Sequence, residues 1–357
     1  MERVNDTGNG GRARRAVLRG LLAGALTGAA AGLGCTRHAS SGSAGRVRIN
    51  TAGLTGEGGL FLAQDRGYFS AAGVAVELLP AALNSSADTL AQLAGGSLDL
   101  ATFAPTAALF NGLSRGLDVV GLLPLNTVSA GDRSTGIVVR QDLLAAGRYR
   151  QPADLRGMKV AVLTIGGIGN YHLLKALQSA NLTGADVTLT TLAFPDCVVA
   201  LANGSIDAAH EAEPFITQCE ARHIASLMIP AGVTGRGVPS AVLFASGAFV
   251  REQRDTVRRF LRALLRGQRD YVAAVDDGVR REEMLESLRR HTSIKDRGLL
   301  AKIRLPSVDA TGAVDAAALA SLQEYFVRLG LQRSVLPLQR VFDRSCLDEA
   351  LAPGAPS

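Results

Sequence analysis

Several loops of the chain join an apolar segment to the start of a helix pattern, and they carry the side chains that could contact a ligand. In chain order, the candidates are Thr55, Glu57, Ser85, Ser86, Pro105, Thr106, Gly167, Gly169, Asn170, Asp196 and Glu213. Helix starts expose unpaired N–H groups and a partial positive charge, which suit an anionic head group. Carboxylates instead accept hydrogen bonds from an amine or an aminopyrimidine. A zwitterion such as taurine satisfies both, and ordinary helix capping is the alternative role for each residue.

Glu213 stands out among these candidates, because it ends an apolar strand pattern in a loop that we expect to face the ligand. Glu211 and the other acidic candidates could join it there. The alternative role for Glu213 is a structural salt bridge with Arg133 or Arg236. If Glu213 binds the ligand, Glu213→Ala should weaken binding without lowering the melting temperature of the ligand-free protein.

Motifs of known enzymes were compared with the chain. Residues 112–116 spell GxSxG, but a nucleophile elbow needs a strand before the serine and a helix after it, and here the order is reversed. Gly167 and Gly169 begin like a dinucleotide-binding fingerprint, but His172 stands where the third glycine belongs. His172 and His210 could line a cleft, although neither has metal-ligand spacing. We therefore predict no catalytic residues, no metal and no cofactor.

The elements that would position these loops occur twice. "LAGGSLDLA" begins at Leu93 and "LANGSIDAA" begins at Leu201, and each closes a strand–helix–strand–helix–strand pattern. The two patterns are offset by about 110 residues, which indicates two similar α/β units. Glycine at the end of each second helix permits a positive φ and lets the chain turn into the next strand. Ligands of such open sheets bind beyond the carboxyl ends of the strands, so two facing units would form one cleft.

Composition limits the classes of partner. The 357 residues are 47% hydrophobic, which is enough for two domains, and tryptophan is absent. The net charge is +6, but about half of it comes from five arginines in residues 1–34. The remaining body has too small an excess of positive charge, and too few aromatic side chains, to suggest nucleic-acid binding.

The N-terminus has the pattern of an export signal. The basic stretch that contains Arg14 and Arg15 resembles a twin-arginine motif, and the uncharged apolar run that follows, residues 20–34, is too short to span a bilayer. Cys35 follows at once, in the place of a lipidated cysteine, and a polar tether comes after it. Gly32 replaces the leucine usual in a lipoprotein box, so an ordinary secretory signal is the alternative.

The other three cysteines show no metal spacing. In an oxidising compartment Cys197 and Cys219 either pair or remain buried thiols, and the sequence leaves both open. Near the C-terminus, residues 254–275 place apolar side chains on one helical face and arginines on the other. This pattern predicts a packed helix with a solvated side, and a membrane-surface role is the weaker alternative.

Five segments together resemble a known family. They are "FLAQDRGYFSAAGVAVEL" from Phe61, "LAGGSLDLA" from Leu93, "ADLRGMKVAV" from Ala153, "LANGSIDAA" from Leu201 and "EPF" from Glu213. In this order they resemble the solute-binding proteins of ABC importers, in the branch that binds sulfonates, taurine, nitrate and thiamine precursors. The resemblance spans Val47 to about Phe249, and the C-terminal hundred residues match only in being helical and basic.

The resemblance implies an α/β fold of two Rossmann-like lobes with mixed sheets, joined by crossing hinge strands: the type II fold of periplasmic binding proteins. It places the crossings near residues 136–140 and 240–245. The expected organisation is an export signal (1–34), a lipidated cysteine and tether (35–45), lobe one (46–135), lobe two (136–240), the rest of lobe one (241–345) and a tail (346–357).

The expected function follows from the same resemblance. It implies an exported, monomeric protein, anchored through Cys35, that closes on a small solute and delivers it to a membrane permease. The solute would be sulfonate-, taurine- or nitrate-like, or a thiamine-type pyrimidine. An exported enzyme or sensory domain on the same scaffold is the alternative.

Overall fold

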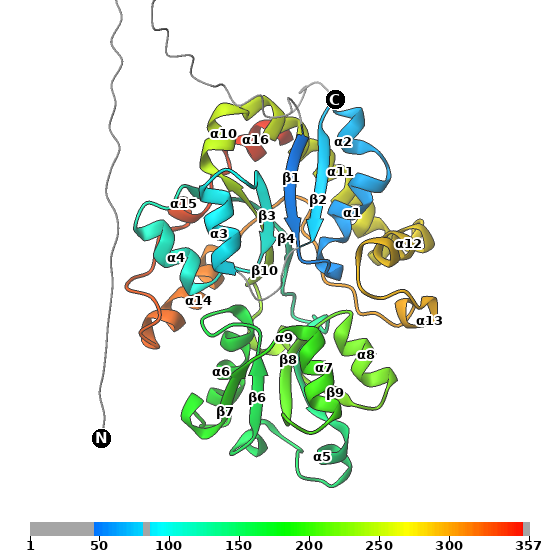
Figure 1. Ribbon diagram of the computed structural model, residues 1–357, viewed down its shortest axis with the longest axis vertical. Coiled ribbons are helices and arrows are strands. Elements are labelled where there is room, and N and C mark those ends of the chain that lie inside the picture. Colours follow the sequence, from blue (N-terminus) through cyan, green and yellow to red (C-terminus); the bar gives the residue numbers. More distant parts are fainter. Residues whose placement is uncertain (1–45, 81–85, 353–357) are drawn as a thin grey trace, which may run out of the picture. The chain divides into compact units, whose positions relative to one another are not determined.

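The computed structural model describes residues 46–80 and 86–352, and for Ser86 the backbone only. The predicted export signal, Cys35, the tether and Ser85 lie outside the described residues. Within these residues the chain forms two sheets of five strands each, which Figure 1 shows in an upper and a lower lobe. No helix in the described ranges combines the length and the apolarity that crossing a membrane would need.

The first lobe is built around one of these sheets. Its strands are β1 (Arg46–Thr51), β2 (Ala75–Pro80), β3 (Leu100–Phe103), β4 (Val119–Thr127) and β10 (Pro239–Ser246). The helices between them are η1 (Thr55–Glu57), α1 (Gly58–Asp65), α2 (Tyr68–Ala71), α3 (Ser86–Ala94) and α4 (Ala107–Ser114).

The second lobe repeats this plan. Its strands are β5 (Thr135–Arg140), β6 (Lys159–Val162), β7 (Thr188–Thr191), β8 (Ala208–Ala212) and β9 (Ala225–Pro230). Its helices are α5 (Gln141–Ala145), η2 (Pro152–Leu155), α6 (Ile168–Ser179), η3 (Gly184–Asp186), α7 (Phe194–Ala202), α8 (Phe215–Ala221) and α9 (Ala231–Thr234).

The two sheets have equivalent strand orders. The first runs β2-β1-β3-β10-β4 and the second β7-β6-β8-β5-β9. In each, the first three strands are parallel, and the fourth is antiparallel and arrives from the other lobe. The strands that receive the chain, β5 and β10, contain the two segments predicted to cross. The predicted α/β fold with two mixed sheets is therefore confirmed, whereas the domain boundaries in residue numbers stay predictions.

The duplicated sequence phrase has the same structural role in both lobes. Gly96 and Gly204, at the ends of α3 and α7, have φ values of +70° and +78°, so each turn uses a conformation that favours glycine. The aspartate three residues later then accepts a backbone N–H of the neighbouring strand. Asp99 accepts from Arg48 N at 2.8 Å, and Asp207 accepts from Lys159 N at 2.9 Å. Each aspartate therefore fixes where its strand enters the sheet.

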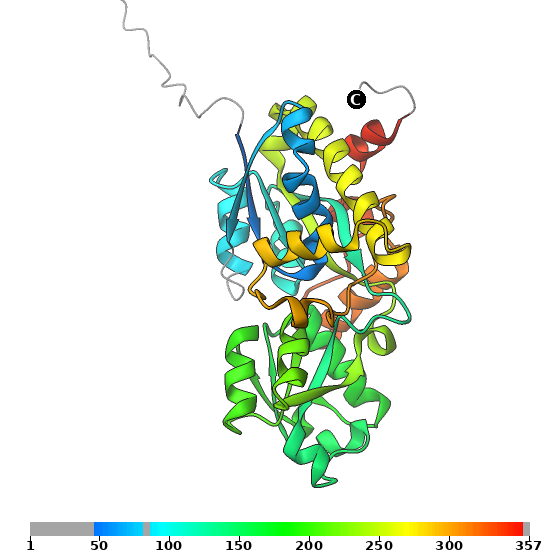
Figure 2. The ribbon, with the colours of Figure 1, turned by 90° about the vertical axis from the view of Figure 1, so that its right-hand side faces the viewer.

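The C-terminal third is helical and packs mainly on the first lobe (Figure 2). Its helices are α10 (Gly247–Glu252), α11 (Arg254–Asp276), α12 (Arg281–His291), α13 (Arg297–Leu300), α14 (Ala316–Arg328), α15 (Leu338–Val341) and α16 (Ser345–Leu351). The predicted apolar face of α11 is buried against α1, α2 and α16, whereas Arg266 and Arg269 are exposed. Each fully buried leucine or phenylalanine of such a face contributes about 1.5–3 kcal/mol.

The GxSxG stretch lies between a helix and a strand, as the sequence predicts. Ser114 is the last residue of α4, and β4 begins at Val119. The Ser114 hydroxyl is exposed and donates a hydrogen bond to the Asn111 carbonyl. This is the reverse of a nucleophile elbow.

Candidate functional site

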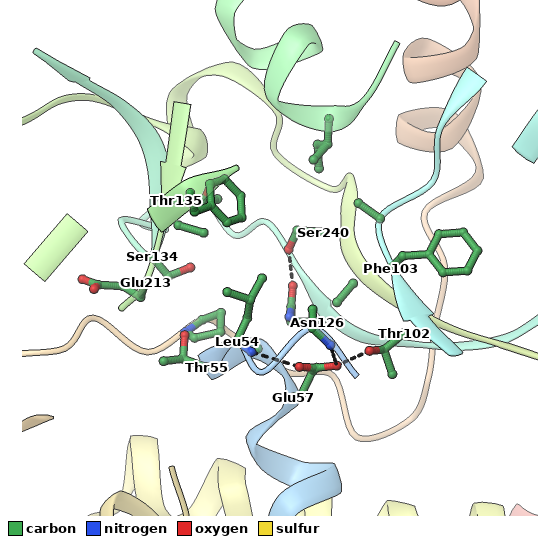
Figure 3. A pocket seen from close by; sticks show the side chains of 18 of the residues that line it. Leu54, Thr55, Glu57, Thr102, Phe103, Asn126, Ser134, Thr135, Glu213 and Ser240 are labelled. Carbon is green, nitrogen blue, oxygen red and sulfur yellow. Dashed lines mark hydrogen bonds between the residues drawn. The ribbon is translucent and has the colours of Figure 1, made fainter. Parts of the chain in front are cut away.

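A cavity of about 150 Å³ lies between the two lobes (Figure 3). From the first lobe and the C-terminal region it is lined by Asn50, Ala52, Leu54, Thr55, Gly56, Glu57, Thr89, Thr102, Phe103, Ala104, Asn126, Ser240, Ala241 and Pro306. From the second lobe and the segment that leads into it, the lining residues are Ser134, Thr135, Leu163, Ile168, Phe194, His210, Ala212 and Glu213. A cavity of this size holds one small ring such as benzene.

The ends of parallel strands position this lining. β1, β3, β6 and β8 all run toward the cavity, and the residues that follow them supply much of its wall. The loop after β1 leads into η1 and α1, and the loop after β8 carries Glu213 into α8. This is the place where open α/β sheets bind ligands.

Glu57 is a buried carboxylate held by the first lobe. It is 1% exposed and accepts hydrogen bonds from the backbone N–H groups of Ala52 and Leu54, both at 3.0 Å. The Thr102 hydroxyl also donates to it, as Figure 3 shows. Burial raises the pKa of Glu57. Since three donors from its own lobe surround this carboxylate, it fixes the loop between β1 and α1 as well as lining the cavity.

Glu213 is equally buried but has partners in two parts of the chain. It accepts hydrogen bonds from the Thr217 hydroxyl at 2.8 Å and from the Thr217 backbone N–H at 3.1 Å. It also accepts from Arg304, through the backbone N–H at 3.3 Å and the guanidinium at 3.4 Å. Burial raises the pKa of Glu213. The structural salt bridge that the sequence left as the alternative role of Glu213 is present, but its cation is Arg304 rather than Arg133 or Arg236.

His210 lines the cavity, and its ring packs against Gly169, where a Cβ would lie 2.6 Å from Nδ1. Its Nε2 lies 3.1 Å from the Thr135 hydroxyl, which itself donates to the Glu211 carbonyl at 2.8 Å. The hydroxyl must therefore accept the Nε2 proton, which leaves Nδ1 unprotonated. Nδ1 has no partner among the residues described. Burial lowers the pKa of His210 to about 4, so the ring is neutral at physiological pH.

A second histidine stacks behind the first. The rings of His172 and His210 are 5.4 Å apart and nearly parallel, and His172 Nδ1 lies 2.7 Å from the Thr234 hydroxyl. Burial lowers the pKa of His172 well below its usual value. Of the two histidines that the sequence suggested, His210 lines the cavity and His172 supports it.

Asn126 and Ser240 complete the polar lining at the point where β4 and β10 pair. The Ser240 hydroxyl donates to the Asn126 carbonyl oxygen, and Figure 3 shows both side chains beside Glu57. Gly56 packs next to them, and a Cβ at that position would lie 1.9 Å from Asn126 Nδ2 and so displace the amide. The sequence analysis missed Asn126, Ser240 and Thr102, although Asn126 is a polar residue at the end of the apolar run of β4.

The charge of the lining is one-sided. It includes the carboxylates of Glu57 and Glu213 and no lysine or arginine. The undescribed residues 81–85 contain neither of these basic types. The lining therefore offers a ligand acidic side chains, neutral hydroxyl and amide groups and apolar surface, but no basic side chain.

Three of the residues predicted as ligand contacts line the cavity, namely Thr55, Glu57 and Glu213. The described residues that do not line it are Pro105, Thr106, Gly167, Gly169, Asn170 and Asp196. The Thr106 hydroxyl accepts from Leu109 N at 3.2 Å and caps α4. Asn170 accepts from Gly166 N at 3.1 Å within the turn that opens α6. For these residues, the role of ligand contact stays a prediction.

The three described cysteines are buried free thiols, so in this structure Cys197 and Cys219 do not pair. None of the three lines the cavity. Burial raises the pKa of Cys219 to about 12 and that of Cys197 further, and the nearby carboxyl of Glu211 adds to both shifts. Glu211 belongs to the core of the second lobe rather than to the site. In the described part of the chain, no cluster of acidic, histidine or cysteine residues could hold a metal ion.

Solved structures with this fold bind small solutes or act on them. The alkanesulfonate-binding protein SsuA of Xanthomonas axonopodis pv. citri, bound to MOPS, is 19% identical, with 83% of this chain and 98% of that chain covered and a TM-score of 0.66. The periplasmic nitrate-binding protein NrtA of Synechocystis PCC 6803 is 17% identical, with 87% and 89% covered and a TM-score of 0.64. The desulfurization enzyme DSZB is 18% identical, with 86% and 98% covered and a TM-score of 0.61. The fold is therefore that of the periplasmic binding proteins.

The family can be stated more closely. The chain belongs to the NMT1/THI5-like family, whose model matches residues 55–276. This stretch holds the second lobe, most of the first and α11. No curated protein matches the chain.

Proposed function

We propose that this protein is the extracytoplasmic solute-binding component of an ABC importer. It would enclose one small organic solute between its lobes and deliver it to a permease. The two-lobed fold and the cavity between the lobes support this function. A solute that contacts both lobes stabilises the closed state over the open one, and a permease can distinguish the two.

We further propose that the solute is a single-ring nitrogen heterocycle with N–H donors, of the thiamine-type aminopyrimidine class. The observation that carries this choice is the lining, which holds two buried carboxylates and no lysine or arginine, Arg304 reaching Glu213 from outside it. Acceptors pair with the amino group of such a ring, and the apolar residues contact its faces. The volume of about 150 Å³ fits one ring.

Sulfonate and nitrate suit this lining less well. A buried anion needs a cation or several aimed N–H donors to replace its hydration. In the cavity wall, the backbone N–H groups of Ala52 and Leu54 already donate to Glu57. Glu57 and Glu213 are either negative or neutral, so neither side chain provides a positive charge for an anion.

Binding is proposed rather than catalysis because the lining offers no activated nucleophile. The described cysteines lie in the cores, and Ser114 lies at an exposed helix end. The hydroxyls of Thr102 and Thr135 are both engaged within the wall. The buried carboxylates hold backbone and side-chain donors in place.

Export and anchoring are part of the same proposal. The segment with Arg14 and Arg15 would direct export, and Cys35 would carry a lipid, which leaves the lobes as a monomeric receptor on the outer side of a membrane. The polar tether after Cys35 would separate the lobes from the bilayer.

A thermal-shift panel followed by calorimetry tests the solute. The probes are the thiamine-precursor pyrimidine (an aminopyrimidine with a hydroxymethyl and a methyl group), taurine, an alkanesulfonate and nitrate. We expect the pyrimidine alone to raise the melting temperature, since a ligand at 100 times its Kd adds about 2.7 kcal/mol to the stability. A shift with the sulfonate and none with the pyrimidine would refute the assigned solute class.

A further inference from the structure

The loop between α13 and α14, residues 301–315, brings Pro306 to the cavity and Arg304 to the second lobe. On the first-lobe side it is anchored at Pro306, whose carbonyl accepts from the buried Tyr271 hydroxyl at 3.2 Å. Ser307 is also fixed, since its carbonyl accepts from Thr127 N at 3.3 Å. Ile303 is 5% exposed and packs in the cluster formed with α1, α11 and α12. Residues 303–307 of this loop are therefore packed on the first lobe.

One side chain of this loop reaches the second lobe. Arg304 donates to Glu213 at 3.4 Å and to Glu220 on α8 at 2.6 Å, and its backbone N–H also donates to Glu213. The other oxygen of Glu220 accepts from Leu227 N at 3.2 Å, so the contact is connected to β9. Arg304 thus joins a fixed loop of one lobe to a helix and a strand of the other.

The burial of the partners makes this contact sensitive to the position of the lobes. The Glu213 side chain is 0% exposed, and those of Arg304 and Glu220 are each 28% exposed. Moving the lobes apart would remove the only cation beside Glu213 that the described residues provide. In a closed protein without Arg304, Glu213 would be buried without its cation and strongly destabilised, so loss of Arg304 favours the open arrangement, in which water can reach the carboxylate.

The same loop also contacts the site itself. Pro306 lines the cavity two residues beyond Arg304, and Glu213 lines it from the opposite lobe. We propose that Arg304 is a latch that holds the two lobes together and positions Glu213 at the cavity wall. A solute seated between Pro306 and Glu213 would favour the arrangement in which the latch forms. The latch deepens the proposed function and rests on it, because closure matters only if a solute is enclosed.

Other contacts between the lobes provide a comparison. Ala107 N donates to the Gly166 carbonyl at 2.8 Å, and Tyr171 meets Tyr325 edge-on with ring centres 5.4 Å apart. These contacts do not involve charge. The latch therefore predicts that removing one charge opens the lobes although these other contacts remain.

The test measures the separation of the lobes in the ligand-free protein. Spin labels at Gln92→Cys on α3 and Gln178→Cys on α6, both exposed positions, report that distance by pulsed electron spin resonance. The full chain carries Cys35→Ser, and the three described native thiols are buried. Arg304→Gln is compared with Arg297→Gln, which removes a charge from an 80% exposed arginine paired with Glu286 in the same region.

We expect Arg304→Gln to lower the ratio of closed to open protein by at least about fivefold, and Arg297→Gln to change it by less than about twofold. Adding Glu220→Gln to Arg304→Gln should produce no further change of comparable size, because the two residues act through one contact. Identical distance distributions for the wild type and Arg304→Gln, or equal shifts in both arginine variants, would overturn the latch. Since no solute is present, a failed latch is distinguishable from a wrong solute assignment.

Discussion

The buried carboxyl of Glu211 predicts an unusual dependence of stability on pH. Glu211 is 0% exposed, and its polar neighbours, the Cys197 thiol and the Ala212 backbone, carry no positive charge. Burial raises the pKa of Glu211 well above its usual value. The folded state therefore retains a proton that the unfolded chain releases above about pH 4.3. Stability is greatest below that pH and is lost as the pH rises toward the pKa of the folded state.

The size of the effect follows from proton linkage. Each pH unit between the unfolded and folded pKa values costs about 1.4 kcal/mol of unfolding free energy. Glu211→Gln removes the titration and keeps the shape of the side chain. As the pH rises from about 5.5 to about 7.5, the wild type should lose more stability than the variant. The difference should be at most about 2.7 kcal/mol. The stability of the variant should still fall as the pH rises, but less steeply, because the pKa values of Glu57 and Glu213 are also raised.

Urea unfolding followed by circular dichroism measures this difference, since the chain has no tryptophan for fluorescence. The slope with pH is the readout, because an amide in the core alters stability at every pH. Glu324→Gln, at an exposed position of α14, is the matched control and should leave the slope unchanged. Equal slopes for the wild type and Glu211→Gln would refute the reasoning.

Three further outcomes are expected. Gly56→Ala should abolish solute binding by displacing Asn126, because the alanine Cβ would lie 1.9 Å from the amide nitrogen of Asn126. Calorimetry with the pyrimidine checks this prediction, and an unchanged affinity would contradict it. Glu213→Ala should weaken binding at least about tenfold and also lower the melting temperature of the ligand-free protein, because Thr217 and Arg304 lose their acceptor. The sequence alone predicted that Glu213→Ala would leave the melting temperature of the ligand-free protein the same. An unchanged melting temperature would support that prediction and contradict the present one. Cys197 and Cys219 should resist thiol reagents in the native protein and react in guanidinium, and rapid native labelling would count against their burial.

The sequence was sufficient to predict the repeated framework of the fold. The helix ends at Gly96 and Gly204, and the aspartates after them, are local features whose cause is written in the residues themselves. Glu57 and Glu213 were also accessible, because acidic residues beyond strand ends in an α/β pattern have a predictable position. Both proved to be held by protein donors, which a sequence does not reveal.

Contacts between distant segments were not predictable. Glu213 and Arg304 are 91 residues apart, and Arg304 lies in the C-terminal region, where the resemblance was weakest. The start of α6 was predicted to contact solute, and this role stays a prediction, because Gly167, Gly169 and Asn170 do not line the cavity. A helix start predicts free backbone N–H donors, but the packing of the lobes decides which groups lie beside these donors.

A crystal structure of the protein grown with the thiamine-precursor pyrimidine tests the central claim most directly. We expect density for one ring between the lobes, with its amino group within hydrogen-bond distance of Glu213 or Glu57. A pyrimidine bound on the outer surface, or a cavity left without it at a concentration that saturates binding in solution, would contradict the account.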